Sequence, residues 1–447
     1  MKFRHYVSLV VLTALFIVFI AFTGWIRPYN LRTEQAAARA AGIPLTPAEF
    51  SQVEPPANQN AVSTYLELGK LLDAHRADET KIWTSPSDGT GVVPKANTEA
   101  LKHLVASRSD ISRVVHAAVA KPHVFVRHDG DSVELYRYLA PMREAAVWIR
   151  RESLMLSREG QPVEAVRHQA LGFRVANQAS EVPNLIACLV GLASEDMTLK
   201  GLENILSEAG PNAVVADAVR REIATYHPRY DLARCLKGEI LLGLTEVHQV
   251  SSLHDYNVVV SPDETFKPSG RKPSGLFKWY FMDPAEAIYL HWMTERIKVS
   301  QEPIPDRLRD LARLGREFEK TPDKMPTYKL AKMMLPIFSG ADEREVDLAA
   351  RRAAVVAMAD VMAYRARHGR WPVSLGQTGS PAPLDPRTGK PVGYRKDGKG
   401  FVVFTTPNPV VAENLSPERA GLNAEIHYPP LKPKPRKMPR MPIPTPS

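Results

Sequence analysis

The residues best suited to metal binding lie in one short stretch of the chain. His123, His128, Asp129 and Asp131 combine imidazole and carboxylate groups, a mixture that zinc or manganese accepts. A hydrolase could use a metal held there. A solvent-exposed loop without any metal would have the same polar composition. We therefore predict no metal or other cofactor, and we keep these four residues as the best metal-ligand candidates.

Other polar groups are less well arranged for catalysis. His248 and His254, with Asp255, are six residues apart, whereas metal-ligand pairs on a helix prefer a spacing of three or four. Paired carboxylates for acid–base catalysis could come from two further groups: Glu195 with Asp196, and Glu343 with Glu345 and Asp347. Charged runs on amphipathic helices usually form the solvated face, and we interpret both groups in this way.

Motifs of known catalytic sites are missing from the sequence. We find no H-E-x-x-H, no G-x-S-x-G, no S-x-x-K with its partner motifs, no P-loop and no G-x-G-x-x-G. The net charge of +9 includes five cations in a tail that has no acidic residue after Glu425, and no nucleic-acid-binding motif accompanies it. We expect no nucleic-acid partner, and the sequence names no catalytic residue.

Two cysteines, Cys188 and Cys235, are too few for a disulfide scaffold. An oxidising compartment would allow them to pair. Small buried thiols within helices are the more common outcome, and we favour that interpretation.

An uncharged apolar run from Tyr6 to Ile26 predicts a membrane-spanning helix. At about 1.5 Å per residue the run covers roughly 30 Å, the thickness of a hydrocarbon core, and Trp25 lies where an interfacial aromatic residue belongs. No later segment of the sequence is as long and apolar. We expect a single-pass protein of a bacterial inner membrane, with residues 6–26 as its membrane contact.

A cleaved signal peptide is the alternative interpretation, because Lys2 and Arg4 form a short basic region before the run. No small-x-small cleavage site follows, and the run exceeds the usual apolar core of about 7 to 15 residues. We favour a retained anchor. Lys2 and Arg4 nearly balance Arg27 and Arg32 on the other flank, but short N-terminal tails usually stay inside, so we expect a periplasmic body.

The middle of the chain is predicted to form antiparallel helical hairpins. Apolar stripes at spacings of three, four and seven residues predict helices over 135–156, 163–173, 185–206, 213–226 and 232–247, and shorter helices over 31–41 and 60–72. This pattern resembles a tetratricopeptide-like array, although no repeat of about 34 residues is present. The predicted class is mainly α, with a transmembrane helix at the start and a small α+β segment at the end.

We divide the chain by composition into five parts. They are an anchor (1–30), a helical extension with loops (31–132), a hairpin bundle (133–340), a helix with a small sheet (341–425) and a Pro- and Lys-rich tail (426–447). The tail cannot fold alone. Its cations could contact an anionic surface. We favour the alternative that the tail only keeps the protein soluble.

An aromatic cluster precedes the predicted helix that bears Ile288 and Trp292. Its members, Phe277, Trp279, Tyr280 and Phe281, could enter a membrane interface or line a pocket. We interpret the cluster as core, because its residues lie on a plausible packing face and no basic stripe flanks it.

The C-terminal segment carries the most specific pattern in the chain. A helix is predicted from Arg344 to Arg367, followed by HGRWPVSL and then by LDPRTGKPVGYRKDGKGFVVFTT. This run resembles the soluble end of type II secretion major pseudopilins and pilin-like proteins. The resemblance implies a corner at Gly369, Trp371 and Pro372, a turn at Asp385, Pro386, Gly389 and Pro391, and strands from Tyr394 and at Phe401–Phe404, with a hairpin loop over 396–400.

The sequence also departs from that family. No acidic residue occurs within the apolar run, where true pseudopilins carry a glutamate, so assembly into a pilus is not expected. The Asp-rich calcium loop is missing too, and we predict no calcium site. The whole arrangement resembles membrane-anchored helical proteins of planctomycete-type bacteria, and that resemblance implies no particular activity.

Three functional hypotheses follow from the sequence. The first is a membrane-anchored extracytoplasmic scaffold that binds a protein partner in the envelope, since stacked helices bind partners without catalytic residues. The second is an accessory component of a type II secretion or pilus-like system. The third is an envelope hydrolase with an unrecognised site near His123–Asp131.

Overall fold

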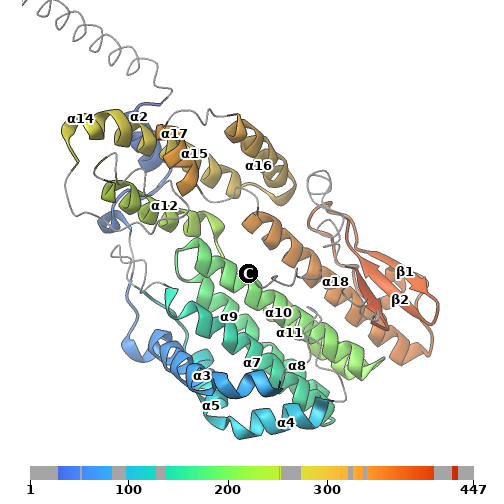
Figure 1. The fold of residues 1–447 in the computed structure, drawn as a ribbon. Coiled ribbons are helices and arrows are strands. Elements are labelled where there is room, and N and C mark those ends of the chain that lie inside the picture. Colours follow the sequence, from blue (N-terminus) through green and yellow to red (C-terminus); the bar gives the residue numbers. More distant parts are fainter. Residues whose placement is uncertain are drawn as a thin grey trace, which may run out of the picture.

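The computed structural model describes residues 29–50, 53–82, 97–126, 136–250, 252, 273–320, 326–335, 340–406 and 425–430. Within these ranges the protein is mainly helical, with one three-stranded antiparallel sheet (Figure 1). The mainly α class and the small C-terminal sheet are therefore confirmed. The likeness to tetratricopeptide arrays stays a prediction.

Helices before residue 126 form two groups. α2 (Leu31–Ala40) packs on a later helix, α15 (Asp283–Ser300), and is followed by the short 3₁₀ turns η1 (Pro47–Glu49) and η2 (Ala57–Gln59). α3 (Val62–Ile82), α4 (Thr98–Ser107) and α5 (Ser109–Ala120) lie at the lower end of Figure 1. α3 and α5 pack against each other and against α7 (Leu139–Arg158).

The middle segment is helical throughout most of its length. α7 is followed by α8 (Pro162–Gln169), α9 (Leu171–Ser180), α10 (Leu185–Ala209), α11 (Ala213–Thr225) and α12 (Leu232–Gln249). The segment predicted as one helix over 163–173 is divided at Ala170 between α8 and α9. Side chains of Asn184, Asn212 and Asp231 accept backbone N–H bonds at the starts of α10, α11 and α12, which fixes where these helices begin.

α10 lies at the centre of this array and crosses α8 and α9 closely (Figure 1). A Cβ atom added at Gly172 would lie 2.1 Å from Oγ1 of Thr198, and one added at Gly201 would lie 2.3 Å from the Gln169 side chain. Only glycine allows the helices to approach so closely. Gly172 of α9 therefore sets the spacing between α9 and α10, and Gly201 of α10 sets the spacing between α10 and α8.

The second half of the chain continues the helical array. A continuous helical run comprises α14 (Gly275–Phe277), the π-helical turn η4 (Lys278–Met282) and α15, and it is followed by α16 (Ile304–Glu319), α17 (Pro326–Met334) and α18 (Gly340–His368). Buried side chains of α18, α10, α12 and α15 belong to one hydrophobic core. A second core joins α3 and α5 to α7 and α9.

The sheet follows α18 through the predicted corner and turn. Gly369 has φ +70°, the Trp371 ring packs on Phe401, and the Pro372 carbonyl accepts a hydrogen bond from the Tyr394 hydroxyl at 2.9 Å. The short 3₁₀ turn η5 (Leu375–Thr378) precedes three strands, β1 (Gly393–Asp397), β2 (Gly400–Phe404) and β3 (Ile426–Tyr428). Asp397 pairs with Gly400, so the hairpin loop is shorter than the predicted 396–400.

Hydrogen bonds to Asp385 close the turn before β1. The buried Asp385 carboxylate accepts hydrogen bonds from the backbone N–H groups of Arg387 and Thr406, at 3.0 and 2.7 Å. Gly389 has φ +66°, and Pro391 forms a β-bridge with Leu384. Pro386 lies directly after Asp385 in this turn. These residues have structural roles that hold the sheet beside α18.

Interpreting the acidic groups as solvated faces is wrong. Glu195 is fully buried, with Arg352 at 2.6 Å and the Tyr226 hydroxyl at 2.9 Å, and Asp196 is buried against Arg344 at 2.9 Å. On α18, Glu345 pairs with Arg307 and Asp347 pairs with Arg387. Periodicity could not reveal this, because the arginine partners lie at least 38 residues away in the sequence.

Both cysteines are free and buried, as favoured from the sequence. The thiol of Cys188 on α10 hydrogen-bonds to Cys235 on α12, and this contact, together with burial, raises the pKa of Cys188. The Cys188 thiol is therefore held in the protonated, unreactive form.

No helix within the described ranges is long and apolar enough to cross a membrane. The predicted anchor at residues 6–26 lies outside these ranges, as does the tail from residue 431 onward. Both remain predictions.

The buried ion pair between α10 and α18 yields a stability prediction. Arg352→Ala should lower the free energy of unfolding by about 3 kcal/mol at pH 8, because it leaves Glu195 buried without its cation. Burial already raises the pKa of Glu195, so protonation should reduce the loss as the pH falls to 5. Urea unfolding followed by circular dichroism measures both values.

The matched control is Arg167→Ala, which breaks an ion pair with Glu164 whose two side chains are both more than half exposed. It should cost less than about 1 kcal/mol. Equal losses of unfolding free energy in the two variants would show that the buried α10–α18 ion pair stabilises the protein no more than an exposed pair does.

Candidate metal centre

The predicted metal-ligand candidates do not form a described site. His123 follows α5, and its Nδ1 lies 3.3 Å from the carboxylate of Glu181, which also accepts the backbone N–H of Val124. His128, Asp129 and Asp131 lie outside the described residues. His123 therefore takes part in a contact that ties the end of α5 to the end of α9.

The second candidate pair is also only partly described. His248 Nε2 lies 3.0 Å from Glu286, whose other oxygen accepts a hydrogen bond from Gln35 at 2.8 Å. His254 and Asp255 lie outside the described residues. The described contacts link α12, α15 and α2.

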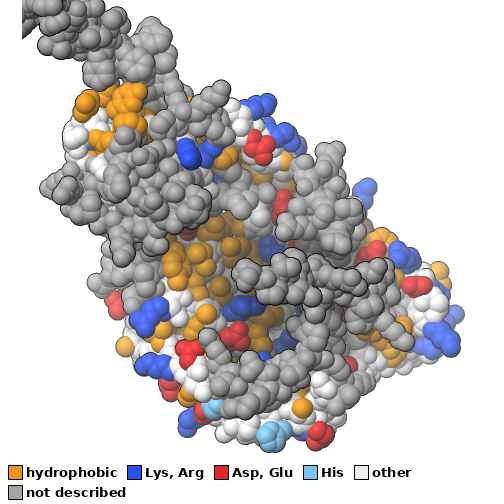
Figure 2. Space-filling view, viewed as in Figure 1, with side chains coloured by type: hydrophobic (Ala, Val, Ile, Leu, Met, Phe, Trp, Pro, Cys, Tyr) orange, Lys and Arg blue, Asp and Glu red, His pale blue; other side chains and the backbone are white. Residues whose placement is uncertain are grey.

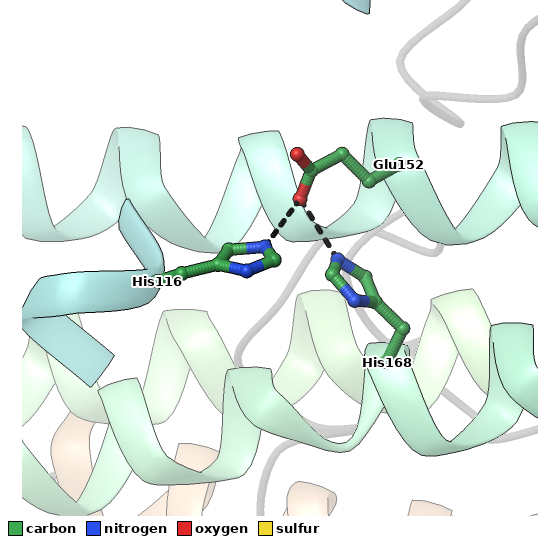
Figure 3. A group of neighbouring side chains, drawn as sticks. All are labelled: His116, Glu152 and His168. Atoms are coloured by element: carbon green, nitrogen blue, oxygen red, sulfur yellow. Dashed lines mark hydrogen bonds and ion pairs between the residues drawn. The ribbon is translucent and has the colours of Figure 1, made fainter. Parts of the chain in front are cut away.

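A different trio of potential metal ligands lies close together. Nε2 of His116 and Nε2 of His168 lie 3.1 and 2.8 Å from the same carboxylate oxygen, Oε2 of Glu152. The three ligand atoms all lie within 4.8 Å of one another. Figure 3 shows both imidazole rings pointing at this oxygen, His116 from the left and His168 from the right of the view. We refer to His116, Glu152 and His168 as the His–Glu–His cluster.

Three helices position the cluster. His116 comes from α5, Glu152 from α7 and His168 from the last turn of α8. The buried stripe of α5 faces the second core, so His116 lies at its edge. The C-terminal end of a helix carries a partial negative charge, which favours a bound cation beside His168.

Two neighbouring side chains hold the carboxylate in place. Trp148, four residues before Glu152 on α7, donates its Nε1–H to Oε1 of Glu152 at 3.2 Å and to Oγ of Ser112 at 3.0 Å. Ser112 lies four residues before His116 on α5. Residues four apart share one face of a helix, as Trp148 and Glu152 do on α7. Since Oε1 is occupied by Trp148, Oε2 is left facing the two imidazoles.

The electrostatic environment favours the ionised carboxylate. Burial alone would raise the pKa of Glu152, but hydrogen bonds from His116, His168 and Ser112 lower that pKa to about 2. The hydrogen bond to Glu152 raises the pKa of His116. Glu152 and His168 have side chains only 9% and 14% exposed, whereas His116 is 49% exposed, so the cluster opens to solvent on one side.

Two imidazole nitrogens and one carboxylate oxygen form a ligand set used for zinc and other divalent transition metals. In a tetrahedral site with bonds of about 2.0 to 2.1 Å, ligand atoms lie about 3.3 Å apart. The two observed nitrogen-to-oxygen distances of 2.8 and 3.1 Å would need to widen by a few tenths of an ångström, and any Nε2 proton that now faces Glu152 would have to be released. A metal held by these three ligands would have room for a further ligand from solvent.

Sequence reasoning missed this cluster because its members lie 36 and 16 residues apart. No local motif joins them, and each sits alone on its own helix. The one available signal was that α5, α7 and α8 are neighbouring amphipathic helices, each carrying a histidine or glutamate beside its apolar stripe. That signal is shared by many polar helix faces.

Comparison with known proteins adds nothing to this geometry: no family model, no curated protein and no solved structure matches the chain. The cluster must therefore be interpreted from its own chemistry.

The cluster predicts a pH dependence in protein kept metal-free with a chelator. Because the folded pKa of Glu152 lies below its unfolded value of 4.5, its contribution is present above pH 4.5 and is lost as the pH falls toward 2. Because the pKa of His116 is raised above 6.5, its contribution is present below pH 6.5 and is lost as the pH rises through the folded value.

We therefore expect Glu152→Gln to lower the free energy of unfolding by about 2 kcal/mol at pH 5.5, the size of a hydrogen bond to a charged group. The difference from wild type should shrink at pH 3 and at pH 9. Urea unfolding at the three pH values tests this, and a loss that does not vary with pH would contradict it.

Proposed function

We propose that the protein binds a divalent transition metal of the zinc class at the His–Glu–His cluster. One observation carries the proposal: three separate helices bring two imidazole Nε2 atoms and one carboxylate oxygen within 4.8 Å of one another. The carboxylate is ionised and is oriented by Trp148 and Ser112, as ligating carboxylates are in metal sites. Such an arrangement binds a cation with little rearrangement.

The metal would have a structural role at this position. It would join α5 to α7 and α8, and so fasten the N-terminal helices to the central array. The second core already packs α3 and α5 on α7, and a metal would add a link at the edge of that core. The open fourth position also allows a bound water, so the hydrolase hypothesis is better supported here than near His123.

The wider role that we propose is a membrane-tethered scaffold on the extracytoplasmic side. Its support is the apolar run at residues 6–26, the stacked helical hairpins and the absence of known catalytic motifs from the sequence. A role beside a type II secretion or pilus-like system is the second candidate. It is supported by the long helix α18 followed by its corner, turn and small sheet.

Zinc binding should be lost when a ligand is removed. We expect the full-length protein in detergent to bind one equivalent of Zn²⁺ in isothermal titration calorimetry. His168→Ala should abolish the binding, because it removes the more buried imidazole. Ser112→Ala should weaken it about tenfold, because it removes only a group that orients the carboxylate.

Two controls locate the site. His248→Ala removes an imidazole that also contacts a buried glutamate, and it should leave zinc affinity unchanged. His128→Ala tests the loop candidate from the sequence. Loss of zinc binding in His128→Ala with retention in His168→Ala would refute the His–Glu–His cluster as the metal centre.

The scaffold role predicts a partner at the C-terminal segment. Val373 and Leu384, beside the sheet, are 72% and 57% exposed, and exposed apolar side chains of this kind suit a protein contact. A photo-crosslinking amino acid at either position should capture the same partner in living cells, and Val214, which is 66% exposed on α11, is the matched control. Equal products at all three positions, or none, would contradict a partner surface at the sheet.

A further inference from the structure

An exposed apolar and aromatic patch covers the start of the α14–η4–α15 run. Leu276 is 59% exposed and Trp279 is 38% exposed. The rings of Trp279, Tyr280, Phe281 and Phe277 lie in successive contact, with centroids 4.9 to 6.3 Å apart. Figure 2 shows hydrophobic side chains gathered at this end of the molecule. The interpretation of the aromatic cluster as core is therefore wrong for Trp279, whereas Phe277 packs against a small core and Ile288, Tyr289, Trp292 and Ile297 are buried.

The π-helical turn accounts for the exposure of Leu276 and Trp279. Pro284 has no backbone N–H, and its ring would clash with the carbonyl of residue 280 in a regular α-helix. Widening the preceding turn to η4 relieves this clash and rotates residues 278–282 relative to α15. Phe277 and Met282 then pack on Val247 and Leu330, whereas Leu276 and Trp279 remain on the surface.

The patch lies at the end of the body where the apolar run leaves it. Tyr29 stacks on His291 of α15 with ring centroids 4.1 Å apart, and the Asn30 side chain caps α2. Only three residue steps separate Tyr29 from Ile26, so covalent geometry holds Tyr29 within about 10 Å of the end of that run. α2 and α14 lie together at this end in Figure 1.

The same helical run connects that point to the patch. Trp279 and His291 are twelve residues apart, which is about 18 Å along a helix axis. If residues 6–26 span a bilayer, the surface of that bilayer lies within reach of both positions. Tryptophan and tyrosine favour the headgroup region of a membrane, and the exposed Lys278 among them suits an anionic phospholipid.

We propose that Leu276, Lys278 and Trp279 dock into the interface of an anionic phospholipid bilayer, as a second membrane contact that orients the body beside its anchor. This inference rests on the proposed tether at residues 6–26. It goes beyond the tether, because a single flexible attachment would leave the body free to rotate, whereas two contacts fix which face meets the membrane.

The test uses the full-length protein in vesicles that contain anionic phospholipid. Leu276→Cys is labelled with an environment-sensitive fluorophore, and Val214→Cys, exposed on α11, is the matched control. Wild type gives the background, because both native cysteines are buried. We expect loss of fluorescence at position 276, and none at position 214, when a lipid carries a nitroxide near its headgroup. Trp279→Ser added to Leu276→Cys should reduce that loss.

Vesicle flotation separates failure of the tether from failure of the patch. Protein that does not float with the vesicles overturns both proposals. Protein that floats but shows no quenching at position 276 retains the tether and overturns the patch. Equal quenching at positions 276 and 214 overturns the patch as well, because the body would then lie on the membrane without a preferred face.

Discussion

The attraction between carboxylates on α10 and guanidinium groups on α18 is the interaction on which the arrangement of this protein depends. Glu195 and Asp196 are adjacent in the sequence, and their buried carboxylates bind Arg352 and Arg344 of a helix about 150 residues further along the chain. A buried carboxylate without its partner is costly, so α18 has one favourable register against α10. That register places the start of the sheet, since Arg387 of the Asp385 turn pairs with Asp347 of α18.

The same central helix also supports the His–Glu–His cluster at a distance. α7 packs on α10, and α8 and α9 cross α10 closely at glycine contacts. Glu152 and His168 therefore sit on helices whose spacing is fixed by packing rather than by loops. His116 is brought to them by α5, which is held by the second core. A site built on rigid helices keeps its ligand atoms in place, which is what metal binding requires.

Local pattern predicted the elements well and their partners poorly. Helices α10, α11 and α12 begin and end close to their predicted bounds, because asparagine or aspartate caps and apolar stripes are local signals. The turn at Asp385 also has local bonds, since the backbone N–H groups of Arg387, Thr388 and Gly389 all donate to Asp385, whereas the bond from Thr406 comes from 21 residues away. Glu195 was misread as solvated, because its burial depends on Arg352. The His–Glu–His cluster was missed for the same reason, and exposure of Trp279 depends on a π turn that precedes Pro284.

The central claim is that two imidazoles and one carboxylate of this chain bind a single metal ion. X-ray absorption spectroscopy of the zinc-loaded, full-length protein at the zinc edge tests it most directly. The account predicts two imidazole nitrogens and a carboxylate oxygen at about 2.0 to 2.1 Å, with a further light ligand from solvent. A shell of oxygen atoms alone, without the scattering pattern of imidazole rings, would contradict it.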